Sequence, residues 1–146
     1  MFADLSKDTD KYHLLLIGTG EDFEETKNLA KNLNIENKIK FAGVVDNVNE
    51  YLQMMDIFIF PSNFEGLGIA GIEAQVSGLP IILSSKIPKD VIISKNAHVL
   101  PITDYKKWIQ KIKELEKIKR GQAEFIENAK KYDNKMFKEQ FDIIIK

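Results

Sequence analysis

The sequence predicts an α/β fold with an open parallel sheet of about five or six strands, helices on both faces and further helices at the C-terminus. Short apolar runs alternate with segments of helical spacing over residues 12–100, which is typical of strands joined by crossover helices. Each apolar run is continuous, as expected for parallel strands that are covered on both faces. This is a Rossmann-like layer.

The first half of the chain supplies two of the expected strands. Residues 1–10 are polar and unpatterned, and residues 12–18 then form an apolar run that ends at a glycine. A helix is expected at 21–33, with acidic residues in its first turn, where the helix dipole favours them. A second strand is expected at 39–43 and a short helix at 48–55.

The middle of the chain repeats the alternation. A strand at 56–62 precedes a loop and a helix that begins near residue 68 or 69 and ends near 77. Gly78 then serves as a C-terminal cap, with Pro80 beyond it. A fourth strand, a turn with a short helix and a candidate fifth strand follow at 80–85, 87–94 and 98–101.

The C-terminal part is helical and amphipathic. Asp104 is the expected N-cap of a helix over 105–120, whose Trp108, Ile112 and Leu115 share one face. Gly121 interrupts this helix, and further helical segments are expected at 122–132 and 134–146. Without a repeat or a low-complexity linker, the sequence predicts a single domain over residues 1–146.

Composition narrows the function. The 146 residues are 44% hydrophobic and 29% charged, as in a soluble globular protein, and the net charge of −1 argues against a nucleic-acid partner. The absence of cysteine excludes disulfides, thiolate metal sites and a cysteine nucleophile, and fits a reducing compartment. No apolar run is long enough to span a bilayer and no signal peptide is evident, so we expect a cytoplasmic location.

Ligands of open parallel sheets bind at the carboxyl ends of the strands. Three loops leave such ends, at residues 18–21, 43–46 and 61–66, and each is rich in glycine or small polar residues. The first loop is similar to a dinucleotide-binding fingerprint, but Phe23 occupies the place of the third glycine. A plain tight turn therefore explains this loop better than a dinucleotide site does.

The third loop carries the most specific pattern. Glu65 and Glu73 flank a segment in which Gly66 and Gly68 allow a ligand to approach the backbone closely. A helix that begins at residue 68 or 69 points unpaired N–H groups toward the loop and so favours an anion. Carboxylates accept hydrogen bonds from hydroxyls, so the pattern suits a nucleotide-sugar; alternatively, Glu65 is a solvated loop residue and Glu73 caps or pairs on the helix.

The stretch "FIFPSNFEGLGIAGIEAQVSGLPII" resembles the glutamate–seven–glutamate signature of the GT-B fold glycosyltransferases of family 4, the group 1 glycosyl transferases. The flanking pieces "IGTGE" and "IKFAGVVDNVNEYLQMMDIFIFPS" occur in the family's order, and the resemblance covers residues 12–100. The piece "EAQVSGLPIILSSKIPKDVI" looks most like enzymes of bacterial capsular or extracellular polysaccharide synthesis.

The resemblance implies that the chain is the C-terminal, donor-binding half of a GT-B fold, without the N-terminal domain that holds the acceptor. It implies a catalytic role for Glu65, close to the donor sugar, and places Glu73 at the ribose hydroxyls. It also implies contacts of the donor with a set of loop residues, which are Gly18 near the phosphates, Val45 at the base, and Gly66, Leu67, Gly68 and Ile69 at the sugar and diphosphate.

The implied reaction transfers a sugar, with retention, from a nucleotide-diphosphate-sugar to a hydroxyl acceptor. A UDP-sugar is the expected donor, a glycan or lipid-linked molecule the expected acceptor, and no metal or other cofactor is expected. The full-length protein is expected to associate peripherally with the inner face of the membrane, and the isolated domain to be inactive or weak.

One departure keeps a rival interpretation open. The family uses an arginine and a lysine upstream of the first strand to neutralise the diphosphate, and Lys7 and Lys11 do not match them. A non-catalytic Rossmann-like binding module is therefore the alternative. A nicotinamide-dependent oxidoreductase is disfavoured by Phe23 and by the lack of an acidic residue at the end of the second strand.

Overall fold

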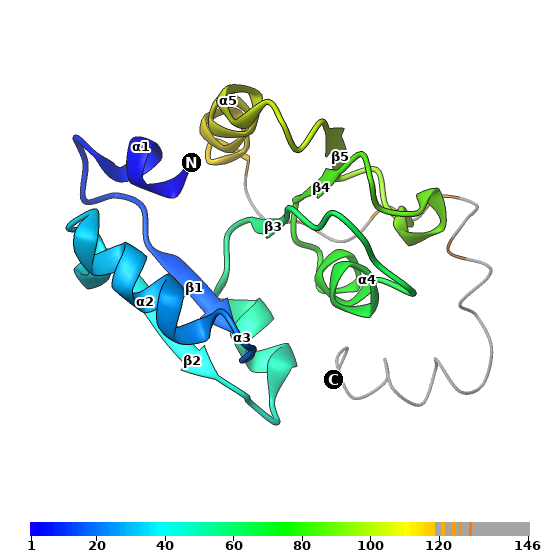
Figure 1. The fold of residues 1–146 in the computed structure, drawn as a ribbon. Coiled ribbons are helices and arrows are strands. Elements are labelled where there is room, and N and C mark those ends of the chain that lie inside the picture. The colour runs from blue at the N-terminus through cyan, green and yellow to red at the C-terminus, as the bar shows by residue number, and fades with distance from the viewer. Residues whose placement is uncertain (119–120, 122–123, 125, 127–128, 130–146) are drawn as a thin grey trace. The chain divides into compact units, whose positions relative to one another are not determined.

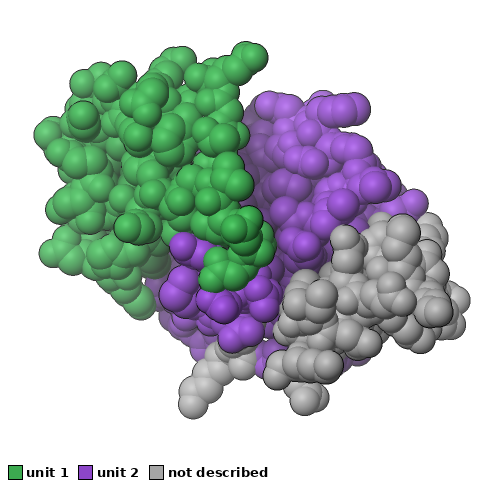
Figure 2. Space-filling view, turned by 90° about the horizontal axis from the view of Figure 1, so that it is seen from below, with its two compact units in different colours: residues 1–48 green, residues 49–146 purple. Residues whose placement is uncertain are grey.

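The computed structural model describes residues 1–118, 121, 124, 126 and 129. It is an α/β structure with parallel sheets and helices, as the sequence predicts (Figure 1). The chain divides into two compact units, residues 1–48 and 49–146, which Figure 2 colours separately and which are treated one at a time below. The expectation of a single domain over residues 1–146 stays a prediction.

The unit of residues 1–48 has a two-stranded parallel sheet. Strands β1 (Leu14–Ile17) and β2 (Ile39–Gly43) pair directly, with Leu14 opposite Ile39 and Ile17 opposite Gly43 after a shift in register. The connection between them contains helix α2 (Phe23–Asn32) and the 3-10 turn η1 (Glu36–Lys38). The predicted strands and helix are confirmed here, β1 and α2 with slightly shorter bounds and β2 with the predicted ones, and the 3-10 turn is an addition.

The first ten residues are ordered by a contact that their own sequence does not reveal. Residues Phe2–Ser6 form helix α1, where the sequence pattern predicted no element. The Lys38 ammonium donates hydrogen bonds to the carbonyl oxygens of Ser6 (2.8 Å) and Thr9 (2.9 Å) and forms an ion pair with Asp10 (3.0 Å). The Lys38 side chain, just before β2, thus holds the first ten residues in place.

The unit of residues 49–146 has a three-stranded parallel sheet. Strands β3 (Phe58–Phe60), β4 (Ile81–Ser84) and β5 (Ala97–Leu100) pair in the order β3-β4-β5, with Phe58 opposite Ile81 and Ile81 opposite Ala97. The remaining elements of this part are α3 (Val48–Met54) at the unit boundary, α4 (Ile69–Val76), the 3-10 turn η2 (Lys89–Val91) and α5 (Tyr105–Leu115).

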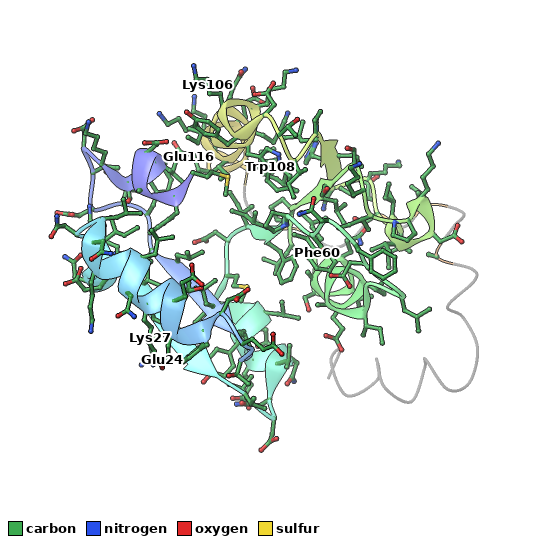
Figure 3. All side chains as sticks on the ribbon, in the orientation of Figure 1. Glu24, Lys27, Phe60, Lys106, Trp108 and Glu116 are labelled. Atoms are coloured by element: carbon green, nitrogen blue, oxygen red, sulfur yellow. The ribbon has the colours of Figure 1, made fainter. Side chains whose placement is uncertain are left out.

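The core of this unit is centred on β4. Ile81, Ile82 and Leu83 have no exposed surface, as expected for a strand that is covered on both faces. Helices α4 and α5 lie on opposite sides of the strands in Figure 1. Helix α5 buries the predicted stripe of Trp108, Ile112 and Leu115, and the Trp108 indole N–H donates to the Pro101 carbonyl oxygen at 2.9 Å (Figure 3).

The predicted caps of the two helices are also present. Asp104 precedes α5, and its carboxylate accepts a hydrogen bond from the Lys107 backbone N–H at 3.2 Å. Gly78 follows α4 in a left-handed conformation (φ 76°), as glycines do after a helix end. Of the helix predicted over 105–120, residues 119–120 lie outside the described residues, as do most of 122–132 and all of 134–146.

The five described strands form two parallel ladders, β1-β2 in the unit of residues 1–48 and β3-β4-β5 in the unit of residues 49–146. Their parallel pairing and the helices between them agree with the predicted α/β class.

Candidate functional site

The unit of residues 1–48 places two loops at one edge of its sheet, because β1 and β2 are parallel and end side by side. Gly18 (φ 110°) and Gly43 (φ 69°) both have left-handed backbone conformations, and the Gly18 N–H donates to the Gly43 carbonyl oxygen at 2.7 Å. A Cβ at either position would meet no atom within 4 Å. Gly18 and Val45, two predicted donor contacts, thus follow neighbouring strands, and the backbone at Gly18 is open to a ligand.

Phe23 explains why the first loop departs from a dinucleotide fingerprint. Its ring packs edge-to-face against Phe41 of β2, with 5.7 Å between centroids. The Lys27 ammonium lies 4.4 Å from the Phe23 ring centroid and pairs with Glu24 (Figure 3). An aromatic side chain therefore attaches α2 to the sheet, where the fingerprint would use a glycine to let the helix approach closely.

The third loop belongs to the unit of residues 49–146 and follows β3. The Ser62 hydroxyl donates to the Phe64 carbonyl oxygen (2.7 Å) and accepts from the Phe64 N–H (3.3 Å), which forms a tight local turn. Ser62 therefore shapes the loop. Glu65 and Gly66 follow this turn and precede the helix.

Gly68 is the point at which the loop becomes a helix. It has a left-handed conformation (φ 59°, ψ 36°) as the N-cap of α4, and its carbonyl oxygen accepts from the N–H groups of Gly71 (2.9 Å) and Ile72 (3.3 Å). Within the helix, no carbonyl oxygen is available to accept from the N–H groups of Ile69 and Ala70, as at any helix start. They and the positive end of the helix dipole therefore favour an anion next to Gly68.

The two glutamates of the pattern do not lie on one continuous helix. Glu65 is in the loop, partly exposed, and Glu73 is one turn inside α4. Burial raises the pKa of the half-buried Glu73 carboxyl above its ordinary value. Among the described residues, neither carboxylate has a hydrogen-bond or ion-pair partner, so both keep their acceptor capacity for a ligand and the pairing alternative for Glu73 finds no support.

The loop also presents apolar side chains to the surface. Phe64, Leu67 and Ile69 are all exposed, and Phe64 is the most exposed, at 86%. The expected contacts of Leu67 and Ile69 with a donor therefore concern their backbone N–H groups, because their side chains face solvent. Gly18 and Val45 belong to the other unit, and Glu65, Gly66, Leu67, Gly68, Ile69 and Glu73 gather around the start of α4.

Sequence reasoning overlooked the contacts beneath this loop. A Cβ at Gly68 would lie 2.8 Å from Val91 Cγ2, and one at Gly71 would lie 2.9 Å from the Phe60 ring (Figure 3 labels Phe60). Val91 itself is held through a buried amide, that of Gln75. The available signal was a glutamine inside the apolar segment that follows Glu73, which indicates a buried polar group in need of partners.

Side chains of the types that bind metals are dispersed in the described part of the chain. Within the described residues there is no group of three or more histidine or acidic side chains that could hold an ion. Asp10 of the Asp8-Thr9-Asp10 segment pairs with Lys38, His13 is exposed just before β1, and burial lowers the pKa of His98 on β5. The described helices are also too short or too polar to cross a membrane.

Three comparisons connect this geometry to known proteins. The family model described as "Glycosyl transferases group 1" matches residues 1–132. An uncharacterized glycosyltransferase of Haemophilus influenzae is 40% identical over 78 residues, which span 53% of this chain and 22% of that protein. The Vi polysaccharide biosynthesis protein VipC/TviE of Salmonella typhi is 40% identical over 68 residues, which span 47% of this chain and 12% of that protein.

Among solved structures, Anabaena Alr3699/HepE in complex with UDP and glucose superimposes with a TM-score of 0.68. The match covers 98% of this chain and 43% of that chain at 16% sequence identity, and it therefore supports the fold alone. The aligned segments cover less than a quarter of the curated relatives named above. The chain corresponds to a part of those proteins.

Proposed function

The chain belongs to the group 1 glycosyl transferases, and on that premise we propose that it binds a nucleotide-diphosphate-sugar and takes part in transferring the sugar to a hydroxyl acceptor. The observation that carries the proposal is the turn at Gly68, which leads from the Glu65 loop into the N-terminus of α4. The half-buried carboxylate of Glu73, which has no partner among the described residues, lies one turn further along.

The start of α4 suits the diphosphate. The N–H groups of Ile69 and Ala70 are directed away from the helix, and a ligand can approach Gly66 freely because no atom lies within 4 Å of its Cβ position. When the sugar leaves, negative charge develops on the diphosphate. Fixed backbone dipoles stabilise such charge without reorganising, which is how this loop would accelerate transfer.

The carboxylates suit the two polyol ends of the donor. Glu73 would accept hydrogen bonds from the ribose hydroxyls, and Glu65, in the loop, would orient the donor sugar at the reacting centre. Gly18 and Val45, which follow β1 and β2, would approach the phosphates and the base. A UDP-sugar is the donor we propose, since UDP is bound in the structurally similar Anabaena HepE.

The remaining features of the proposal concern the whole protein. We assign transfer with retention at the anomeric carbon, without a metal, to a glycan or lipid-linked acceptor in polysaccharide synthesis. The Vi polysaccharide relative supports that pathway class. The relatives are longer than this chain, so an N-terminal domain would supply the acceptor site, and the protein would act at the inner face of the cytoplasmic membrane.

Calorimetry on the purified protein tests the donor site. We expect UDP, or else GDP or ADP, to bind with a dissociation constant below the millimolar range. Glu73→Ala should weaken that binding about tenfold or more, because it removes a charged acceptor of hydrogen bonds from the ribose hydroxyls. Glu25→Ala, on the exposed face of α2, is the matched control. If no nucleotide binds, or if Glu73→Ala binds as tightly as the unchanged protein, the donor-site assignment is wrong.

Turnover distinguishes an enzyme from a binding module. The full-length protein with radiolabelled UDP-glucose and a polyprenyl-linked sugar acceptor should form a glycosylated product, and NMR of the product should show the anomeric configuration of the donor. Nucleotide binding without product, with several sugar donors tried, would favour the non-catalytic module. A product with the inverted anomeric configuration would overturn only the assignment of retention.

A further inference from the structure

Gln75 of α4 is a fully buried polar side chain whose amide uses both of its ends. Its Nε2 group donates to the carbonyl oxygens of Gly71 and Val91, both at 2.8 Å. Its Oε1 atom accepts from the N–H groups of Ile93 (2.9 Å) and Ser94 (3.0 Å) and from the Ser94 hydroxyl (3.3 Å). Both N–H donors and both lone pairs of the amide are therefore occupied.

The partners of this amide connect α4 to a segment far away in sequence. Gly71 lies on the same helix, whereas Val91, the last residue of η2, and Ile93 and Ser94, which follow it, lie 16 to 19 residues after Gln75. The glutamine thus fixes the backbone on both sides of Ile92. This bracing lies within one compact unit.

Val91 transmits this bracing to the loop. Its side chain is 1% exposed, and its Cγ2, Cγ1 and Cβ are the three atoms nearest to the Cβ position of Gly68, at 2.8, 3.2 and 3.6 Å. The Gly68 backbone therefore rests directly on Val91. Any shift of the Val91 backbone would alter the turn at Gly68 and the direction of the N–H groups that follow it.

We propose that Gln75 is a positioning residue for the nucleotide-sugar donor, acting through Val91 on the loop at Gly68 without touching the donor itself. The inference rests on the proposed function of that loop. It assigns the glutamine a role beyond filling the core. The amide fixes the position of the Val91 backbone, and the Val91 side chain supports the anion-binding turn at Gly68. The position of such a turn matters, because residues that act on a site from a distance can change its coupling to a ligand without touching that ligand.

The chemistry of the site explains why an amide is required. Two carbonyl oxygens face one end of the side chain and two N–H groups face the other. A carboxylate at position 75 would satisfy the N–H groups but would direct an acceptor at the carbonyl oxygens of Gly71 and Val91. Methionine has a similar length and satisfies neither pair, so it would leave buried backbone groups without partners.

Two variants test the inference by different routes. Gln75→Glu keeps the size of the side chain and removes its two N–H donors. Val91→Ala keeps the hydrogen bonds between the Gln75 side chain and the backbone, and removes the methyl groups that support Gly68. Each should weaken binding of UDP, measured by calorimetry well below the melting temperature of the variant, by about tenfold. If UDP is not the nucleotide that the unchanged protein binds, GDP or ADP serves as the probe.

Ile93→Ala is the matched control for Val91→Ala. Ile93 is similarly buried (2%) and lies on the same segment. Alanine keeps its backbone N–H bond to Gln75, and its side chain contributes none of the three atoms nearest to the Cβ position of Gly68. It should lower the melting temperature and leave UDP affinity within about twofold, since core packing away from a site affects stability more than binding. A purely structural role for Gln75 would instead leave UDP affinity unchanged in all three folded variants.

The outcomes separate this inference from the proposed function. If the unchanged protein binds none of the three nucleotides, the proposed function fails and the inference fails with it. If it binds a nucleotide and both folded variants bind equally well, only the inference is overturned. If Gln75→Glu does not fold, Val91→Ala compared with Ile93→Ala decides alone.

Discussion

The side chain of Val91 supports the backbone of Gly68 so closely that a Cβ at residue 68 would lie 2.8 Å from Val91 Cγ2. Gly68 also has a left-handed conformation, with φ at 59°. Steric contact and backbone conformation thus require glycine independently at the residue where the loop enters α4. The start of this helix is accordingly sensitive to single substitutions.

Gly68→Ala should destabilise the protein by about 2–4 kcal/mol, combining the strain of a left-handed non-glycine residue with the overlap on Val91. Urea denaturation followed by circular dichroism measures this change. Gly68→Ala combined with Val91→Ala should recover part of the loss, because the overlap is relieved and the backbone strain is not.

Gly66→Ala is the control for this substitution. Gly66 lies two residues earlier in the same loop, and no atom lies within 4 Å of its Cβ position. The free energy of unfolding of the Gly66→Ala variant should stay within about 0.5 kcal/mol of that of the unchanged protein, as for other surface substitutions. Equal losses for the two glycines would contradict the steric explanation.

Glu73→Gln should raise the melting temperature at neutral pH. Burial raises the pKa of Glu73 in the folded protein above its unfolded value, so the stability linked to its protonated form is present at low pH and is lost as pH rises through the folded pKa. The charged form is then a cost to folding at neutral pH that glutamine avoids.

The gain from Glu73→Gln should therefore shrink as the pH is lowered toward about 4, close to the ordinary pKa of a glutamate. Melting curves at several pH values measure it, and Glu25→Gln on the exposed α2 surface should show no such dependence. A gain that does not change with pH would contradict burial as the cause. We expect the same variant to bind nucleotide more weakly at neutral pH.

Lys38→Met should loosen the N-terminus of the chain. The Lys38 side chain is only 14% exposed, and the substitution removes a charged donor from two backbone carbonyl groups, those of Ser6 and Thr9. Hydrogen bonds to charged groups contribute about 1.5–3 kcal/mol, and a loss on that order is expected. Amide hydrogen exchange in α1 should accelerate as well.

Asp10→Asn distinguishes the carbonyl contacts of Lys38 from its ion pair. The Asp10 side chain is 95% exposed, and exposed ion pairs contribute only about 0–1 kcal/mol. The asparagine variant should therefore stay close to the unchanged protein in both stability and hydrogen exchange. A loss equal to that of Lys38→Met would mean that the ion pair is the main contact.

Trp108→Phe should destabilise the protein by about 1–3 kcal/mol, because it removes the donor of the part-buried hydrogen bond to the Pro101 carbonyl oxygen and shortens a side chain that is only 1% exposed. Trp108 is the only tryptophan, so the unchanged protein should emit blue-shifted fluorescence that moves to the red on unfolding. Tyr105→Phe on the exposed side of α5 should be nearly neutral in circular-dichroism melting curves. Red emission from the folded protein would contradict the burial of Trp108.

The elements that were predicted well are those with a local signal. The run "DIFIFPS" contains β3, the glycine and proline after residue 77 mark the end of α4, and Asp104 caps α5. Each depends on periodicity or on a capping residue within a few positions. The glycines between Glu65 and Glu73 also indicated the loop and the helix start, and Gly68 has the left-handed conformation at which α4 begins.

The prediction was incomplete where a distant partner is needed. Helix α1 is short and lacks a strong pattern, and its anchor, Lys38, lies about thirty positions later. The division of the strands into two ladders likewise depends on which strand edges pair, which no single strand specifies.

The sequence by itself thus determined the alternation of strands and helices, the glycine at the helix start and the glutamates around it, since these follow from backbone conformation and local spacing. Only the tertiary structure decided that Val91 supports Gly68 and that Gln75 holds Val91 in place. The physical reason is that side-chain packing and buried hydrogen bonds join residues whose spacing along the chain follows no regular pattern. Such contacts form only when the segments meet.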